Sequence, residues 1–180
     1  MHLTQDAEDA VRGLYSRDQI YESLTVSKDE EVLADLNYAI TNNELQKPDL
    51  IIHAGDVGYQ NIVDILQSIA PIKVVNGNCD FQAFRTIEGE TTDYLYFDFD
   101  GVKISLTHVP YDLEHYEEDG WEINMHVHGH THESYIEQIG ENEINICPGS
   151  SSMGRYGTPN SIATVYILNG QILLAQLIKV

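Results

Sequence analysis

The sequence predicts an α/β fold in which two mixed β-sheets pack face to face and helices lie outside them. In the first half of the chain, short apolar strands alternate with segments of helical periodicity, which is typical of a parallel sheet flanked by helices. In the second half, strands follow one another with only turns between them. The chain has 180 residues and contains no internal repeat, so it can form one domain with a substantial core.

The first half contains the predicted helices. Residues 1–19 form an acidic amphipathic segment that we expect to be a helical extension preceding one domain over residues 20–180. Ser27 can cap a helix over residues 29–41, whose apolar side chains recur at helical spacing. A second helix is expected over residues 62–69. The strands expected between these helices cover residues 21–26, 50–53 and 71–75.

The second half contains the predicted hairpins. Strands over residues 94–99 and 102–107 are joined by Asp100-Gly101, a pair suited to a type I′ turn. Asn169-Gly170 joins the last two strands, 161–168 and 171–178, in the same way. Three further strands are expected over residues 123–128, 134–139 and 142–146.

The composition limits the classes of partner. The chain has 29 acidic and 9 basic residues and a formal charge of −20, so it repels long nucleic acid but not a small phosphorylated substrate. No apolar stretch of membrane-spanning length and no signal peptide is present, so we expect a cytoplasmic protein that does not bind membranes. Two cysteines are too few for a disulfide framework. The sequence leaves open whether the protein is a homo-oligomer.

Polar residues that commonly bind metals follow four predicted strands directly. Asp56, Asn78 and His108 each come after one strand, and His130 and His132 come after another. Glycines beside most of them allow sharp turns and close approach of the backbone. Because open α/β sheets place ligands at the carboxyl ends of their strands, we expect these side chains to meet at one metal centre.

Other interpretations of the same residues remain open at this stage. Asp56 could cap the helix that follows it, and Asn78 could serve only to form a turn. His126 and His128 alternate with Val127 on one strand, so packing or hydrogen bonding is expected for them rather than metal binding. We expect Cys79 to be a packed residue rather than a reactive thiol.

Four motifs in order resemble those of the calcineurin-like metallophosphoesterases. They are Gly55-Asp56, Gly77-Asn78-Cys79-Asp80, Thr107-His108 and Gly129-His130-Thr131-His132. The second motif and the short chain are most similar to the small YfcE-type phosphodiesterases of bacteria and archaea. The resemblance extends from about residue 20 to residue 180 and includes Cys147-Pro148-Gly149-Ser150, followed by Arg155. It implies a four-layer αββα sandwich of two mixed β-sheets flanked by helices.

The resemblance also implies a metal-dependent hydrolase that cleaves small phosphodiesters with a metal-activated hydroxide. Asp56 would bridge two metal ions about 3.5–4 Å apart. Asn78, His108 and His130 would complete one ion, and His132 would bind the other. Manganese is the activator we expect, with iron, nickel and zinc as alternatives, because this mixed donor set does not select one metal. Arg155 could hold a substrate phosphate or pair with a surface acid.

The first motif of the family is altered in this chain. The family's Asp-x-His would fall where this sequence has Lys28 and Glu30. The protein could therefore bind one metal, rebuild the second site with Asp29 or Glu30, or have lost activity and act as an interaction module with the same fold. In addition, Cys79 stands where many relatives have a histidine that is thought to protonate the leaving group. His53 and His128 are alternative donors, or the substrate's leaving group needs no strong acid.

Overall fold

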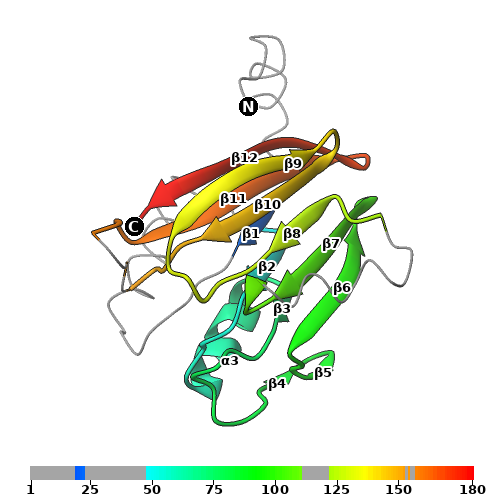
Figure 1. Cartoon of the computed structure of the whole chain (residues 1–180). Coiled ribbons are helices and arrows are strands. Elements are labelled where there is room, and N and C mark those ends of the chain that lie inside the picture. The colour runs from blue at the N-terminus through cyan, green and yellow to red at the C-terminus, as the bar shows by residue number, and fades with distance from the viewer. Residues whose placement is uncertain (1–18, 23–47, 111–121, 153, 155–156) are drawn as a thin grey trace.

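A computed structural model describes residues 19–22, 48–110, 122–152, 154 and 157–180. Its elements form two five-stranded mixed sheets, a two-stranded hairpin and one helix (Figure 1). The predicted helices over residues 1–19 and 29–41 lie outside the described residues. Within the described part of the chain, no helix is both long and apolar enough to cross a membrane.

The first sheet has the order β12-β11-β1-β2-β3. Its strands are β1 (Gln19–Glu22), β2 (Leu50–His53), β3 (Ile72–Val74), β11 (Ser161–Leu168) and β12 (Gln171–Lys179). β1, β2 and β3 are parallel, and β11 runs antiparallel to β1. The strand predicted over residues 21–26 begins two residues earlier, at Gln19, and its residues from 23 onward lie outside the described part.

The second sheet has the order β6-β7-β8-β10-β9. Its strands are β6 (Tyr94–Phe99), β7 (Val102–Thr107), β8 (Met125–Val127), β9 (Ser134–Gly140) and β10 (Glu143–Pro148). β8 pairs in parallel with both β7 and β10, so its carboxyl end lies beside the carboxyl end of β7. All five strands confirm the predicted ones to within two residues at each end.

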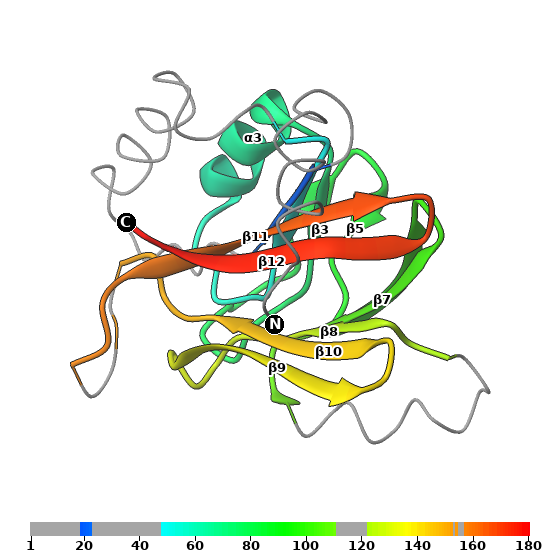
Figure 2. The same ribbon diagram turned by 90° about the horizontal axis from the view of Figure 1, so that it is seen from above.

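One core lies between the two sheets, as the view from above indicates (Figure 2). Ile52 and Val165 of the first sheet share this core with Ile104 and Val127 of the second. Burial of such side chains contributes roughly 1.5–3 kcal/mol each. The predicted face-to-face packing of two mixed sheets is therefore confirmed.

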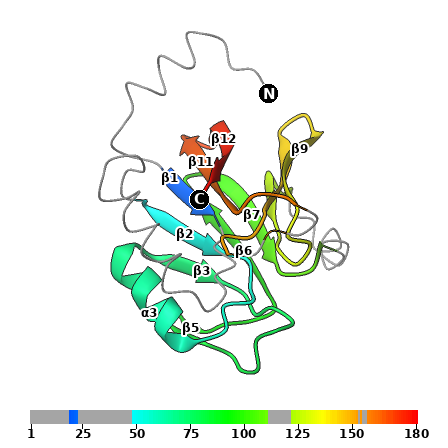
Figure 3. The same ribbon diagram turned by 90° about the vertical axis from the view of Figure 1, so that its left-hand side faces the viewer.

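A second core lies under helix α3 (Gln60–Ile69). Ile62, Val63 and Leu66 are buried on one face of the helix, against Ile51 and Val74 of the first sheet. Figure 3 shows α3 on the side of that sheet that faces away from the second sheet. Alternate residues of β2 therefore enter different cores, which explains why its four residues are all buried.

Two tight turns hold the sheets together at one end. Asp100 and Asn169 have φ values of 48° and 51°, as the predicted type I′ turns require. The two turns also contact each other: the amide of Gly170 donates to the carbonyl of Asp100 at 2.6 Å, and the amide of Asn169 donates to the Asp100 carboxylate at 2.6 Å. This contact fastens the two sheets at the end where β7 and β12 begin.

The hairpin of β4 (Arg85–Thr86) and β5 (Gly89–Glu90) is an element that the sequence did not predict. Gln60 at the start of α3 donates to the carbonyl of Arg85 and accepts from its amide. Phe84 and Thr91 flank the hairpin and are buried. The hairpin thus extends the loop after β3 along α3.

Candidate metal centre

Four predicted ligands meet at one end of the two packed sheets, opposite the end that carries the Asp100 and Asn169 turns. Asp56 follows β2, Asn78 follows β3, His108 follows β7 and His130 follows β8. Each sheet contributes two parallel strands whose carboxyl ends are adjacent. Because the sheets pack face to face, the two pairs of loops come together, and the predicted convergence of these four residues is confirmed.

The donor atoms of these four side chains are closely spaced. Asn78 Oδ1 lies 2.9 Å from His108 Nε2 and 2.8 Å from His130 Nδ1. His108 Nε2 lies 3.3 Å from His130 Nδ1 and 3.5 Å from Asp56 Oδ1. Neighbouring ligands at right angles around one ion, with bonds of about 2.1 Å, have donor atoms about 3 Å apart. The four atoms are therefore spaced as the ligands of a single divalent ion.

The amide oxygen of Asn78 is essential to this group. Among the described residues, no three His, Cys, Asp or Glu side chains form a metal-binding group by themselves. The Asn78 oxygen contacts both imidazoles and thereby completes the set. A donor set of carboxylate, amide and imidazole suits several divalent metals.

The hydrogen bonding of His108 leaves a lone pair directed at the centre. Its Nδ1 lies 2.6 Å from the carbonyl oxygen of Ala54, which can only accept, so the ring proton is on Nδ1. In this tautomer of the neutral ring, Nε2 carries a lone pair and faces the oxygens of Asn78 and Asp56, which are also acceptors. Acceptors that face one another repel unless a cation or proton lies between them. The arrangement therefore fits a bound cation, with Ala54 fixing the orientation of the imidazole.

The loops that carry the ligands require unusual backbone conformations. Among the described residues, five non-glycine residues have positive φ, and three of them are the predicted ligands Asp56, His130 and His132, with φ of 57°, 67° and 59°. Such conformations cost roughly 1–2 kcal/mol each for residues with a Cβ. The other two, Asp100 and Asn169, belong to the hairpin turns. Strain is thus concentrated at the centre, where function can explain it.

Gly77 allows the Asp56 and Asn78 loops to approach each other. A Cβ atom on Gly77 would lie 2.1 Å from the backbone nitrogen of Asp56 and 2.2 Å from its Oδ1. Since real Cβ contacts are never that short, only glycine fits at this position. The amide of Cys79 also donates to Asp56 Oδ1 at 2.8 Å, which orients this carboxylate.

Asp80 joins the same two loops, a role that the sequence did not predict for it. Its carboxylate accepts from the amide of Gly58 at 2.8 Å and from the amide of Gly77 at 2.7 Å. It thereby links the segment after Asp56 to the segment before Asn78. Its place as the last residue of Gly-Asn-Cys-Asp was the available signal, but only its partner Gly77 lies in that motif, whereas Gly58 lies in another loop.

Two further histidines, His53 and His128, are buried beside the site. His53 is fully buried and burial lowers its pKa to about 3, while burial also lowers the pKa of His128. His128 contacts the Gly129 carbonyl through Nδ1 and the Tyr135 hydroxyl through Nε2. His126 lies between Ser105 and Glu143. Hydrogen bonding is thus confirmed for His126 and His128, and neither His53 nor His128 is poised as a proton donor.

The expectation that Cys79 is packed is wrong, because it is exposed, in the turn that also carries the exposed Asn78. The alternative that Asp56 caps α3 is excluded, because the helix is preceded by Tyr59 and has no side-chain cap. The ligand interpretation of Asp56 is the one that remains.

His132 is the one further predicted ligand that lies among the described residues. It follows His130 in the same turn and also has a positive φ. Asp29, Glu30, Lys28 and Arg155 lie outside the described residues. Their roles stay predictions.

Solved structures of several proteins have the same fold as this chain. An archaeal phosphodiesterase described as novel aligns with a TM-score of 0.68 at 19% identity, covering 90% of this chain and 99% of its own. The phosphoesterase YfcE of E. coli aligns with a TM-score of 0.62 at 19% identity, covering 88% and 98%. Vacuolar protein sorting 29 of Entamoeba histolytica, complexed with Zn²⁺, aligns with a TM-score of 0.59 at 16% identity, covering 89% and 98%.

The sequence itself gives the family. A curated relative named probable metallophosphoesterase, from Methanothermobacter thermautotrophicus, is 29% identical over 137 residues, covering 73% of this chain and 76% of its own. The family profile described as calcineurin-like phosphoesterase superfamily domain matches residues 34–170, which include all four converging ligands. Together with the geometry of the donor set, this match shows that the chain belongs to the calcineurin-like phosphoesterase superfamily.

Proposed function

We propose that this protein is a metal-dependent phosphoesterase that hydrolyses small phosphodiesters. The observation that carries the proposal is the convergence of four acceptor-type atoms from Asp56, Asn78, His108 and His130 within 2.8–3.5 Å of their neighbours. When bound there, a divalent ion would supply a nucleophilic hydroxide at neutral pH and polarise the phosphoryl oxygens. The names of the archaeal and E. coli neighbours support the reaction class.

The residues of the proposed site lie on a buried side and on a solvent-exposed side. The side chain of His108 is only 4% exposed, and its hydrogen bond to the Ala54 carbonyl holds it in place, so it forms the buried side. Asn78 is exposed and faces solvent, where a substrate phosphate can approach. Cys79, unlike histidine, is a weak acid donor, so substrates with good leaving groups suit this site. The net charge of −20 favours small substrates over long nucleic acid.

Manganese is the metal we propose, with iron, nickel or zinc as alternatives, because amide, carboxylate and imidazole donors do not select among them. The zinc complex of the E. histolytica sorting protein supports divalent metals as a class. We propose that His132 serves a second ion and that Arg155 contacts the substrate phosphate. In the same way, we infer that the complete fold is a four-layer αββα sandwich.

The proposal is tested with bis(p-nitrophenyl) phosphate and added Mn²⁺. We expect turnover in the wild type and a loss of at least about 100-fold in His130→Ala, Asp56→Ala and Asn78→Ala, together with lower metal content by elemental analysis. Asn142→Ala is the matched control for Asn78→Ala, because Asn142 is also an exposed amide but lies in the β9–β10 turn. Wild-type protein without turnover and without bound metal would contradict the proposal.

The alternative function is an interaction module with a weakened or absent metal site. It is favoured by the residues Lys28 and Glu30, which occupy the positions of the family's first motif. A lysine ammonium near the site repels a second cation. We expect Lys28→Asp combined with Glu30→His to raise the metal stoichiometry towards two and to increase turnover. If the double variant behaves like its parent in both measurements, this placement of the first motif is wrong.

A further inference from the structure

Two exposed aromatic side chains lie on the loops that carry Asp56 and Asn78. Tyr59 is three residues after Asp56 and is 50% exposed; Phe81 is three residues after Asn78 and is 103% exposed. Among the described residues, Phe81 is the most exposed of the large apolar side chains. Three residues of chain separate Cα atoms by at most about 11 Å, so the backbone of Tyr59 lies within that distance of Asp56, and the backbone of Phe81 within that distance of Asn78.

The two loops are held in a fixed relation. The Asp80 carboxylate, next to Phe81, accepts from the amide of Gly58, next to Tyr59, and also from the amide of Gly77. The Asp80 amide in turn donates to the Gly77 carbonyl at 3.1 Å. Asp80 therefore holds the backbone at Phe81 in a fixed position relative to Asn78 and to the loop that contains Tyr59.

Folding gives no reason for the exposure of Phe81. An aromatic side chain gains most from burial, and Phe84, three residues later, is completely buried in the core under α3. The loop thus buries one phenylalanine and leaves the other exposed, three residues after the predicted ligand Asn78. An exposed aromatic face suits the stacking of a planar ring carried by the ligand.

We propose that Phe81, assisted by Tyr59, is a specificity-determining residue that stacks on the base of a nucleoside phosphate ester while the metal centre holds the phosphate. This inference rests on the proposed function and adds the substrate class. The acidic charge of the chain disfavours long polynucleotides, so the ligand is a mononucleotide or short oligonucleotide ester. Phe81 contacts the part of the substrate that does not react, and it takes no part in the chemistry.

The test compares two ligands that differ only in the base. Adenosine 5′-monophosphate and ribose 5-phosphate are titrated calorimetrically into the full-length protein with saturating Mn²⁺. Base stacking on an aromatic side chain changes affinity by about 5- to 150-fold, so we expect the nucleotide to bind more tightly by a factor in that range. Phe81→Ala should remove this preference without changing the affinity for ribose 5-phosphate, and Phe81→Trp should retain it.

Ile87→Ala is the control, since Ile87 is 88% exposed but lies in the β4–β5 turn. It should leave both affinities unchanged. Equal affinity of the wild type for the two ligands would overturn the inference, as would an equal loss of both affinities in Phe81→Ala. Hydrolysis of bis(p-nitrophenyl) phosphate separates the two proposals: turnover without base preference overturns this inference alone, whereas no turnover and no binding of either ligand overturn both.

Discussion

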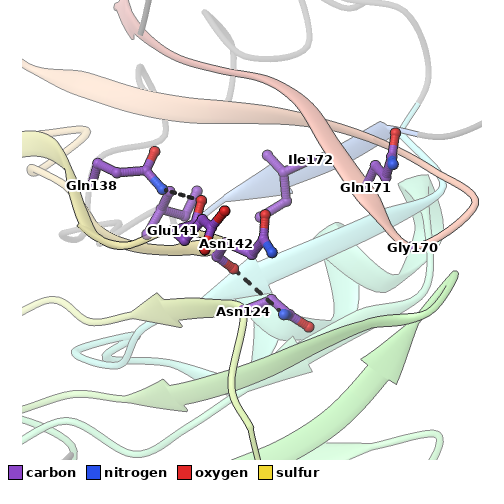
Figure 4. Close-up of a pocket in the computed structure, with 8 residues that line it drawn as sticks. Asn124, Gln138, Glu141, Asn142, Gly170, Gln171 and Ile172 are labelled. Carbon is purple, nitrogen blue, oxygen red and sulfur yellow. Dashed lines mark hydrogen bonds between the residues drawn. The ribbon is translucent and has the colours of Figure 1, made fainter.

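The two ends of the sandwich differ in whether their polar side chains are paired as hydrogen-bond donor with acceptor. At one end the oxygens of Asp56 and Asn78 face the lone pair of His108. At the other end a cavity of about 340 Å³ lies between the β9–β10 and β11–β12 turns (Figure 4), and the side-chain amides of Gln138 and Asn124 in its wall are paired as donor with acceptor. Gln138 Nε2 donates to the carbonyls of Gly140 and Glu141.

Asn124 makes the contrast clear, because it precedes β8 while His130 follows it. Its Oδ1 accepts from the Lys103 amide and its Nδ2 donates to the Asn142 carbonyl. The cavity is therefore a gap between turns whose hydrogen bonds are already made. The comparison teaches that facing acceptors, rather than empty volume, distinguish the end at which we propose that a metal binds.

The largest effect is expected from closing the space between the Asp56 and Asn78 loops. Gly77→Ala places a methyl group against the Asp56 backbone, so we expect metal binding to be lost and turnover to fall at least about 100-fold. Overpacking should also lower the free energy of unfolding by about 3 kcal/mol. Metal analysis and chemical denaturation check this.

Gly58→Ala is the matched control in the next loop. Gly58 has a φ of 81°, but an added Cβ meets nothing within 4 Å among the described residues. It should cost about 1 kcal/mol of stability through backbone strain and leave the metal content unchanged. If both variants retain metal equally, the close approach at Gly77 does not shape the centre.

A smaller effect is expected from protonation of His53. Its pKa is about 3 when folded and near 6.5 when unfolded, so the unfolded chain binds more protons between these values. The stability that His53 contributes is complete above pH 6.5 and is lost as the pH falls towards 3. Between pH 7.5 and 5 this residue should account for about 2 kcal/mol of the decrease.

Denaturation in EDTA at several pH values, for wild type and His53→Leu, isolates this contribution. Neither ring nitrogen of His53 has a hydrogen-bond partner among the described residues, so leucine should be tolerated at pH 7.5. Asn124→Ala, at the other end, should keep the wild-type pH dependence, because amides do not titrate. An unchanged slope in His53→Leu would show that other groups cause the acid sensitivity.

The smallest effect on stability is expected from adding one negative charge at either end of the sandwich. Asn78→Asp adds a carboxylate beside Asp56, which should destabilise the metal-free protein by about 1 kcal/mol, or roughly 2–4 °C in Tm. Added Mn²⁺ should raise the Tm of this variant more than that of the wild type. Asn124→Asp should also destabilise, since it removes a donor to Asn142, but Mn²⁺ should not restore it. An equal response to Mn²⁺ in both variants would place the metal elsewhere.

Local patterns in the sequence were sufficient to predict most of the fold. Strands 94–99 and 102–107 were predicted to the residue, because Asp100-Gly101 fixes the turn and the apolar side chains of Val102, Ile104 and Leu106 alternate. The β4–β5 hairpin was missed because strands of two residues carry no periodicity. It depends instead on contacts with Gln60, 25 residues away.

The candidate site was predictable to a similar degree. Ligand-type residues at strand ends indicated where Asp56, Asn78 and His108 would lie, because the ends of parallel strands converge. The role of Asp80 could not be predicted, since it depends on the amide of Gly58 in another loop, 22 residues away. The exposure of Cys79 depends likewise on how the turn after β3 is held, which no local pattern specifies.

The contact between the Asp100 and Asn169 turns has a consequence for motion. It joins residues 69 positions apart and ties the two sheets at one end, while the bond from His108 Nδ1 to the Ala54 carbonyl ties them at the other. Sliding of one sheet against the other would therefore have to break hydrogen bonds at one end or the other. Amide protons near the two turns should exchange slowly, and a bound ion would add a further link between the sheets at the end that carries the ligands.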